Sequence, residues 1–338
     1  MSVIDIITGY GNAFLPLPAA TLPSELPKAR TLLWALQTPG FAHYSLAWSP
    51  FHTTRIAVAS SANFGLVGNG RLHLVSLTPN APGPTPAPGV RYETQDGLYD
   101  VAWSEVHENQ LVTASGDGSI RLWDIMLNDH PIRAWQEHTR EVFSVDWSNL
   151  KKDTFASSSW DGPAILTTPT RTARDVLNRR DTQIFDLRAP SYASSNPLIP
   201  IQTHRSTRTE VLSLDWNKYR PMVLATAGVD KTVRVWDCRM VKAGQNDQVG
   251  GVCESQLLGH EYAVRKVQWS PHRPDVLATA SYDMTCRVWT TTPTPGRPQL
   301  LHIHDPHTEF VVGVAWSLYD EGVLASCGWD GKVHVFRP

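Results

Sequence analysis

Apolar and polar positions alternate in short runs along most of this chain, and the clearest unit covers residues 257–290. Val264 to Trp269 alternates as a half-buried strand does. Val276 to Ser281 predicts a second strand, and the β-branched and aromatic residues from Thr285 to Trp289 favour a third. Turn-forming residues separate these strands. The pattern predicts one small antiparallel sheet whose fourth strand leads into the next unit.

The same phrase recurs six times, each time with an apolar run that ends in a tryptophan. These anchors are Trp48, Trp103, Trp147, Trp216, Trp269 and Trp316. The strand that closes a unit often ends in an aromatic residue, as at Trp123, Phe185, Trp236, Trp289 and Phe336. The anchors lie 44 to 69 residues apart. Such a period indicates a repeat architecture in which each unit buries its apolar face against its neighbour. Small sheets arranged radially form an all-β propeller.

We expect one propeller domain over residues 31–338, preceded by a poorly ordered extension over residues 1–30. The chain ends just after the last predicted strand, Lys332 to Phe336. The final sheet therefore needs a fourth strand from elsewhere. Leu32 to Gln37 is the natural candidate, because this pairing would join the ends of the array and remove exposed sheet edges.

One interval departs from the repeat. From Trp147 to Trp216 is 69 residues, too long for one sheet and too short for two. The expected closing strand is replaced by residues 163–181, and the repeat phrase resumes only at Thr182. We therefore expect that one sheet has lost its first two strands, or that this stretch replaces them.

Polar residues within the repeats predict a buried network. In the unit 257–290, His260, Thr279, Asp283 and the indole N–H of Trp289 could link three strands, so that each buried polar group finds a partner. A hydroxyl, a histidine and an aspartate could also form a hydrolytic triad. Turn aspartates recur, however, at Asp117, Asp161, Asp230, Asp283 and Asp330. A catalytic set would normally occur once, so we interpret the network as structural.

Composition excludes several function classes. Thirty basic residues against 32 acidic ones leave no basic footprint for nucleic acid. No segment is apolar for long enough to cross a bilayer, so we expect no stable membrane insertion. No two of the four cysteines have C-x-x-C spacing, which favours reduced, buried thiols.

The chain also lacks the phrases of common catalytic centres: a phosphate-binding loop, H-E-x-x-H and G-x-S-x-G. We predict that it is no enzyme and needs no cofactor. His302, His304 and His307 lie close together in sequence. They belong to a loop that leads into a strand, so we predict no functional metal site there.

Several specific sequence segments then point to a family. Gly259-His260 and the Trp-Asp pairs at 123–124 and 236–237 resemble WD repeats. Residues 60–73, 95–105 and 259–267, together with His307 to Phe310, closely resemble the WD-repeat receptors for the type 2 peroxisomal targeting signal. The resemblance covers about residues 38–162 and 182–338. That family has seven blades, whereas six repeats are recognisable here.

The resemblance implies an import receptor that shuttles between the cytosol and the peroxisome matrix. Its cargo, such as thiolase, would carry an N-terminal helix of the form Arg-(Leu/Val/Ile)-five residues-(His/Gln)-(Leu/Ala). A co-receptor peroxin would complete the binding groove, and a peroxisomal docking complex would receive the assembly. A scaffold or adaptor for chromatin or a ubiquitin ligase is the alternative, because it shares every fold-level feature.

The repeat pattern also predicts where such a signal would bind. The loop leading into each first strand and the turn after each second strand share one face, here called the top. The predicted signal-binding residues on this face are Tyr44, Phe64, Tyr99, Glu141, Phe143, Trp160, Glu210, Tyr282, Phe310 and Trp329. Aromatic pockets would hold the apolar stripe of an amphipathic helix. Glu141 or Glu210 would pair with the arginine of the signal.

Overall fold

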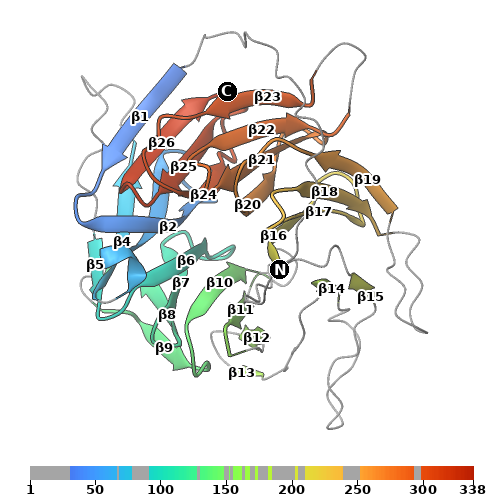
Figure 1. The fold of residues 1–338 in the computed structure, drawn as a ribbon. Helices are drawn as coiled ribbons and strands as arrows, with labels where there is room; N and C mark the ends of the chain where they lie inside the picture. The colour runs from blue at the N-terminus through green and yellow to red at the C-terminus, as the bar shows by residue number, and fades with distance from the viewer. Residues whose placement is uncertain are drawn as a thin grey trace.

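Seven antiparallel sheets make up the described part of the computed structural model (Figure 1). The structure describes residues 31–66, 68–77, 91–127, 130–147, 152, 155–161, 164–167, 172–173, 182–184, 202–204, 210–238, 252–292 and 298–338. Six sheets have four strands and one has two. The all-β propeller fold is therefore confirmed. The predicted extension over residues 1–30 lies outside the described residues.

Each sheet forms one blade, numbered here along the chain. Blade 1 contains β2 (Phe41–Trp48), β3 (Arg55–Ala62), β4 (Gly70–Ser76) and β5 (Arg91–Thr94). Blade 2 contains β6 (Leu98–Trp103), β7 (Gln110–Ser115), β8 (Ser119–Asp124) and β9 (Arg133–Gln136). Blade 3 contains β10 (Val142–Trp147), β11 (Phe155–Ser159), β12 (Ala164–Thr167) and β13 (Thr172–Ala173). Blade 4 contains β14 (Thr182–Ile184) and β15 (Gln202–His204).

The second half of the ring repeats this order. Blade 5 contains β16 (Val211–Trp216), β17 (Val223–Gly228), β18 (Val233–Asp237) and β19 (Val252–Leu257). Blade 6 contains β20 (Val264–Trp269), β21 (Val276–Ser281), β22 (Cys286–Thr290) and β23 (Leu300–His304). Blade 7 contains β24 (Val311–Trp316), β25 (Leu324–Gly328), β26 (Lys332–Arg337) and the early strand β1 (Thr31–Gln37).

The ends of the chain close the array, as the sequence predicted. Strand β1 pairs antiparallel with β26, from Thr31 opposite Arg337 to Gln37 opposite Lys332. The N–H of Thr38 continues the pairing by donating to the carbonyl of Gly331 at 2.8 Å. Blade 7 thus combines an early strand with the last three strands, and the outer edge of β26 is covered.

The tryptophan anchors fasten neighbouring blades together. Each anchor ends an inner strand, and four of their indoles donate to the preceding blade. Trp48 bonds Ala315 O at 3.1 Å, Trp103 bonds Ala47 O at 3.0 Å, Trp269 bonds Asp215 O at 3.1 Å and Trp316 bonds Gln268 O at 3.2 Å. Inner strands of neighbouring blades have no backbone hydrogen bonds between their sheets, and these indole bonds link them instead. This explains why tryptophan recurs at the end of the inner strand.

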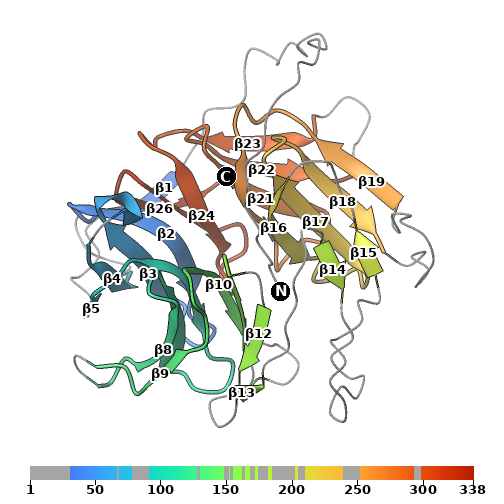
Figure 2. The ribbon, with the colours of Figure 1, turned by 60° about the horizontal axis from the view of Figure 1, so that its bottom comes forward.

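Apolar clusters fill the space between blades. Among the described residues they join blade 7 to blade 1, blade 1 to blade 2, blade 2 to blade 3, blade 5 to blade 6, and blade 6 to blade 7. Residues of the inner strands β2, β6, β10, β16, β20 and β24 line one shared central channel. Figure 2 shows the sheets arranged around this centre. No described helix has the length and apolar character that a bilayer crossing requires.

The structure assigns the irregular interval between Trp147 and Trp216 to particular blades, which the sequence pattern could not do. Residues 163–181 include β12 and β13, which complete blade 3. The deficit falls in blade 4, whose described part has only β14 and β15. Blade 5 follows it, and the end of its inner strand, Leu214 to Trp216, is only half-buried, whereas β24 of blade 7 is buried throughout.

Candidate functional site

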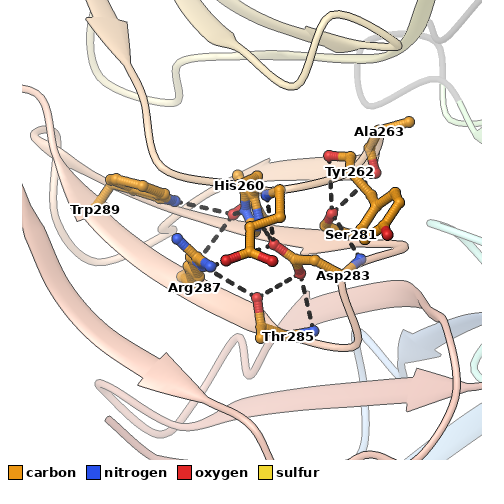
Figure 3. A network of polar contacts seen from close by, with 10 residues as sticks. His260, Tyr262, Ala263, Ser281, Asp283, Thr285, Arg287 and Trp289 are labelled. Carbon is orange, nitrogen blue, oxygen red and sulfur yellow. Dashed lines mark hydrogen bonds and ion pairs between the residues drawn. The ribbon is translucent and has the colours of Figure 1, made fainter. Parts of the chain in front are cut away.

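A buried polar network ties the strands of blade 6 to the loop that enters it (Figure 3). His260 Nδ1 lies 2.7 Å from Asp283 Oδ2, and its Nε2 lies 2.7 Å from Thr279 Oγ1. The indole of Trp289 donates to the same hydroxyl at 2.9 Å. All four residues predicted to form this network are thus in contact. Arg287, which the sequence analysis did not include, adds an ion pair to Asp283 at 3.3 Å.

The network recurs, which supports a structural interpretation. In blade 3, His138 contacts Asp161 at 3.0 Å and Ser157 at 2.9 Å. In blade 7, His307 contacts Asp330 at 3.0 Å and Ser326 at 2.9 Å. Each histidine belongs to the loop before an inner strand, each hydroxyl to the second strand and each aspartate to the following turn. The set therefore fixes the top of a blade three times.

Burial and the partner carboxylate act in opposite directions on the pKa of His260. Desolvation lowers the pKa of His260, although hydrogen bonding to Asp283 raises it. The same contact helps to hold the pKa of Asp283 far below its ordinary value. The network is therefore most stable with a neutral imidazole and an ionised carboxylate.

The top face carries a continuous series of aromatic rings, here called the aromatic face. It consists of Tyr44, Phe64, Tyr99, Phe143, Trp160, Tyr282, Phe310 and Trp329. These are all eight aromatic residues that the sequence predicted for this face.

Consecutive rings of the aromatic face are in contact from blade 3 round to blade 6. The centroid distances are 4.4 Å for Trp160–Phe143, 4.7 Å for Phe143–Tyr99, 5.0 Å for Tyr99–Tyr44, 5.8 Å for Tyr44–Trp329, 5.2 Å for Trp329–Phe310 and 4.9 Å for Phe310–Tyr282. Phe64 lies 5.8 Å from Trp329. The series therefore crosses blades 3, 2, 1, 7 and 6 without a break.

Backbone hydrogen bonds explain why these positions converge. The N–H of Trp329 donates to the carbonyl of Phe310 at 2.9 Å, and the N–H of Trp160 donates to that of Glu141 at 3.2 Å. The residue before the turn aspartate is thus fastened to the residue that precedes the inner strand. The same bond occurs in blades 2, 5 and 6, so side chains at the two positions share the top face in these five blades.

Phe64 reaches the aromatic face through an unusual turn. Asn63 and Phe64 have positive φ values of 48° and 55°, which L-residues rarely adopt. The hydroxyl of Tyr44 donates to Phe64 O at 2.6 Å, and that of Tyr99 donates to Gly65 O at 3.2 Å. A side chain at Gly65 would lie 2.8 Å from the Tyr44 hydroxyl, so glycine is required there. Two tyrosines therefore hold a half-exposed phenylalanine (51% accessible) in place.

The two predicted acids lie at equivalent positions on either side of blade 4. Glu141 precedes the inner strand of blade 3 and lies 3.6 Å from Arg140. Glu210 precedes the inner strand of blade 5, and its carbonyl accepts the N–H of Val229 at 3.0 Å. Val229 stands where blades 3, 6 and 7 have an aromatic residue. The aromatic series therefore runs from blade 3 to blade 6, and the two acids lie on blades 3 and 5, beside its ends.

Two charged residues outside the predicted set also belong to this region. Arg265 lines the mouth of the channel with Tyr44 and Tyr99. Asp96 lies close to Tyr99, and burial, Asp96 and Glu141 together raise the pKa of that phenol. The only sequence signal for Asp96 was its place in the segment 95–105. Periodicity did not select it, because it lies outside the repeat positions.

Two indole nitrogens on the aromatic face, those of Trp160 and Trp329, are buried and find no acceptor within the described residues. A buried N–H without a partner is costly, so an acceptor that reaches either nitrogen would be stabilised there. Both tryptophans are in equivalent positions before a turn aspartate.

Comparisons with known proteins agree with this architecture. The family described as WD domain, G-beta repeat, matches residues 90–124, 196–237, 251–290 and 298–337. The chain is 33% identical to the peroxisomal targeting signal 2 receptor of Saccharomyces cerevisiae, over 88% of this chain and 97% of that protein. It is 40% identical to peroxisome biogenesis protein 7 of Arabidopsis thaliana, over 88% and 95%. It is 35% identical to the peroxisomal targeting signal 2 receptor of Mus musculus, over 90% and 96%.

These relatives are named as receptors or biogenesis proteins, and none of the three names is that of an enzyme. The chain belongs to the family of WD-repeat peroxisomal targeting signal 2 receptors.

Proposed function

We propose that this protein is an import receptor that binds the N-terminal type 2 peroxisomal targeting signal of its cargo on the aromatic face. The names of its relatives support the biological role. The observation that carries the binding site is the unbroken series of rings across five blades. Those names favour this function over the chromatin or ubiquitin-ligase adaptor that the fold alone would also allow.

The chemistry of the signal matches the face. Its two apolar positions and its two polar positions lie on one side of a helix. An apolar stripe gains most by burial against aromatic rings, which lose little conformational freedom on binding. Trp160 and Trp329 would provide indole N–H donors at the margin of the bound helix. The helix would therefore lie across the rings in a helix-in-groove arrangement.

The acids give the helix a direction. Glu141 and Glu210 flank blade 4, at the open end of the aromatic series. An arginine at the start of the signal would pair with one of them, and the apolar positions would then lie over blades 2, 1 and 7. In a partly desolvated pocket this charge-assisted bond contributes about 1.5–3 kcal/mol.

A co-receptor peroxin would cover the side of the helix that faces away from the propeller, because an open face buries only one side of its ligand. A peroxisomal docking complex would then receive the assembly, and the receptor would shuttle between the cytosol and the peroxisome matrix. These partners follow from the family and form part of the proposal.

The aromatic face is tested by one pair of variants in blade 1. Phe64 and Phe51 are the same residue type with similar exposure, 51% and 40%, at opposite ends of β3. We expect Phe64→Ala to weaken binding of a labelled signal helix at least fivefold, because a central aromatic contact contributes more than about 1 kcal/mol. Phe51→Ala should leave the affinity unchanged. Equal affinities for the two variants, in titrations with and without co-receptor, would exclude this face.

The acids are tested by the double variant Glu141→Ala/Glu210→Ala. Losing the ionic partner of the signal should weaken binding tenfold or more. The peptide with Arg replaced by Glu should bind the wild-type protein poorly and should lose little further in the double variant. A double variant that binds the original peptide with unchanged affinity would contradict the assignment of the acids, whatever the rings contribute.

A further inference from the structure

We propose that His304, His307 and His334 bind a divalent transition metal, with zinc as the preferred ion, at the junction of blades 6 and 7. One nitrogen from each ring can be chosen so that all three lie within 4.8 Å of one another, and all three residues are buried. His304 ends the outer strand β23 of blade 6, His307 lies in the following loop and His334 lies on β26 of blade 7. This site does not depend on the proposed signal binding.

Two of the ligands are already spaced for a metal. His304 Nε2 lies 3.1 Å from His334 Nδ1. Two nitrogens bound to one tetrahedral zinc at about 2.0–2.1 Å lie roughly 3.3–3.4 Å apart, so this pair needs to move by only a few tenths of an ångström. The ring of His304 stacks on Phe336 at a centroid distance of 3.8 Å and an angle of 4°, which fixes its orientation.

The third ligand has the support that zinc-binding histidines usually have. His307 Nδ1 contacts Asp330 at 3.0 Å, so the carboxylate sets the tautomer and directs Nε2 inward. Nε2 now contacts the hydroxyl of Ser326 at 2.9 Å, and ligation would replace this one bond. The rings of His307 and His334 are only 4.3 Å apart between centroids. Three imidazoles leave a fourth position for water, as zinc accepts.

Blade 6 lacks the site although it has the same network. The position of His334 opposite Ser326 corresponds to that of Arg287 opposite Thr279. Arg287 is a cation that pairs with Asp283 and cannot ligate a metal. Among the described residues, the blade 7 cluster is the one group of three potential ligands in metal-binding proximity.

The histidines that meet in space differ from those that are neighbours in sequence. His302, His304 and His307 lie close together along the chain, but the packing of blade 6 against blade 7 places His334, and not His302, beside His304 and His307. A metal there would join the outer strand of blade 6 to β26, the strand that receives β1. Binding would therefore strengthen the closure of the ring.

The test uses the untagged full-length chain, stripped with a chelator and then dialysed against zinc. We expect about one zinc per chain by elemental mass spectrometry, and a Co²⁺-substituted protein with the visible absorption of a tetrahedral site. His334→Arg should lose the metal, because it gives blade 7 the residue of blade 6 and a partner in Asp330. His302→Ala is the matched control and should retain the metal.

A second variant guards against loss of the fold. His304→Gln should bind less than a tenth of the wild-type zinc while it unfolds at the same temperature as the wild type in chelator. Zinc should raise the unfolding temperature of the wild type and of His302→Ala only. A wild-type protein with less than 0.1 zinc per chain, or a His334→Arg variant that binds as much as the wild type, would overturn the proposal.

Discussion

Blades 6 and 7 share a histidine, a hydroxyl and an aspartate but surround them differently. In blade 6 the hydroxyl of Thr279 accepts the indole N–H of Trp289, and Arg287 reaches the aspartate. In blade 7 the residues at the corresponding places are Phe336 and His334, and neither makes the corresponding bond.

This difference shows which residues of the network are shared by both blades and which positions vary. The three-membered core fixes the loop, the second strand and the turn in both blades. The two flanking positions on the third strand do not have to carry the same chemistry. In blade 7 one of these two positions is His334, which belongs to the histidine cluster.

Removing the aspartate of each network should have the largest effect on the unfolding free energy, and the two effects should differ. Asp283 accepts from His260, from Thr285 and from a buried Arg287, so Asp283→Ala should cost about 3–5 kcal/mol of unfolding free energy, since it leaves a buried cation unpaired. Asp330→Ala leaves only Lys332, which lies 3.9 Å away and is partly exposed, so it should cost about 2 kcal/mol.

Urea unfolding of the two aspartate variants in the presence of chelator measures the difference, with the wild type as reference. An Asp330→Ala variant less stable than Asp283→Ala would show that the arginine is not what separates the blades.

The repeat itself was predictable because its causes are local. The tryptophan anchors, the turn aspartates and the alternation of β20 each follow from one blade meeting the next. The pairing of β1 with β26 was predictable as well, because the last sheet lacked a strand and an open edge is unfavourable. The placement of β12 and β13 was not, because residues 163–181 lack the closing aromatic that marks other third strands.

The candidate site was only partly predictable. Aromatic residues at repeat positions converge because the backbone of every blade has the same geometry. Asp96 and the turn at Phe64 depend on two tyrosines from different blades, and no spacing along the chain records that contact. The proximity of His334 to His304 likewise depends on how β23 packs near β26. This is a tertiary contact between residues 30 positions apart in sequence.

Low pH should also destabilise blade 7 through a histidine that contacts it. His43 lies on β2 of blade 1 and faces blade 7, where its Nδ1 contacts the carbonyl of Lys332 at 3.3 Å; its Nε2 contacts Thr38 at 2.6 Å. No carboxylate bonds it, in contrast to His260, and burial lowers its pKa to about 4. The unfolded chain therefore binds this proton first as the pH falls.

The stability that His43 provides is complete above pH 6.5 and is lost between about pH 6.5 and pH 4, by at most about 3 kcal/mol. His43→Gln should remove that part of the acid dependence from urea midpoints measured between pH 7 and pH 4.5. A variant that keeps the full wild-type slope would show that His43 is not the group that titrates.

The smallest expected effect comes from making blade 6 resemble blade 7. Trp289→Phe removes the indole that donates to Thr279 at 2.9 Å and keeps an aromatic ring like Phe336. It should cost about 1–2 kcal/mol, because one buried hydrogen bond is lost while most of the packing stays. Trp236→Phe in blade 5 is the matched variant, since Trp236 donates to Thr226 at the same distance of 2.9 Å. Similar losses in urea unfolding would mean that the bond sets the cost, and a loss above about 4 kcal/mol at Trp289 alone would mean that packing against Gly259 and His260 does.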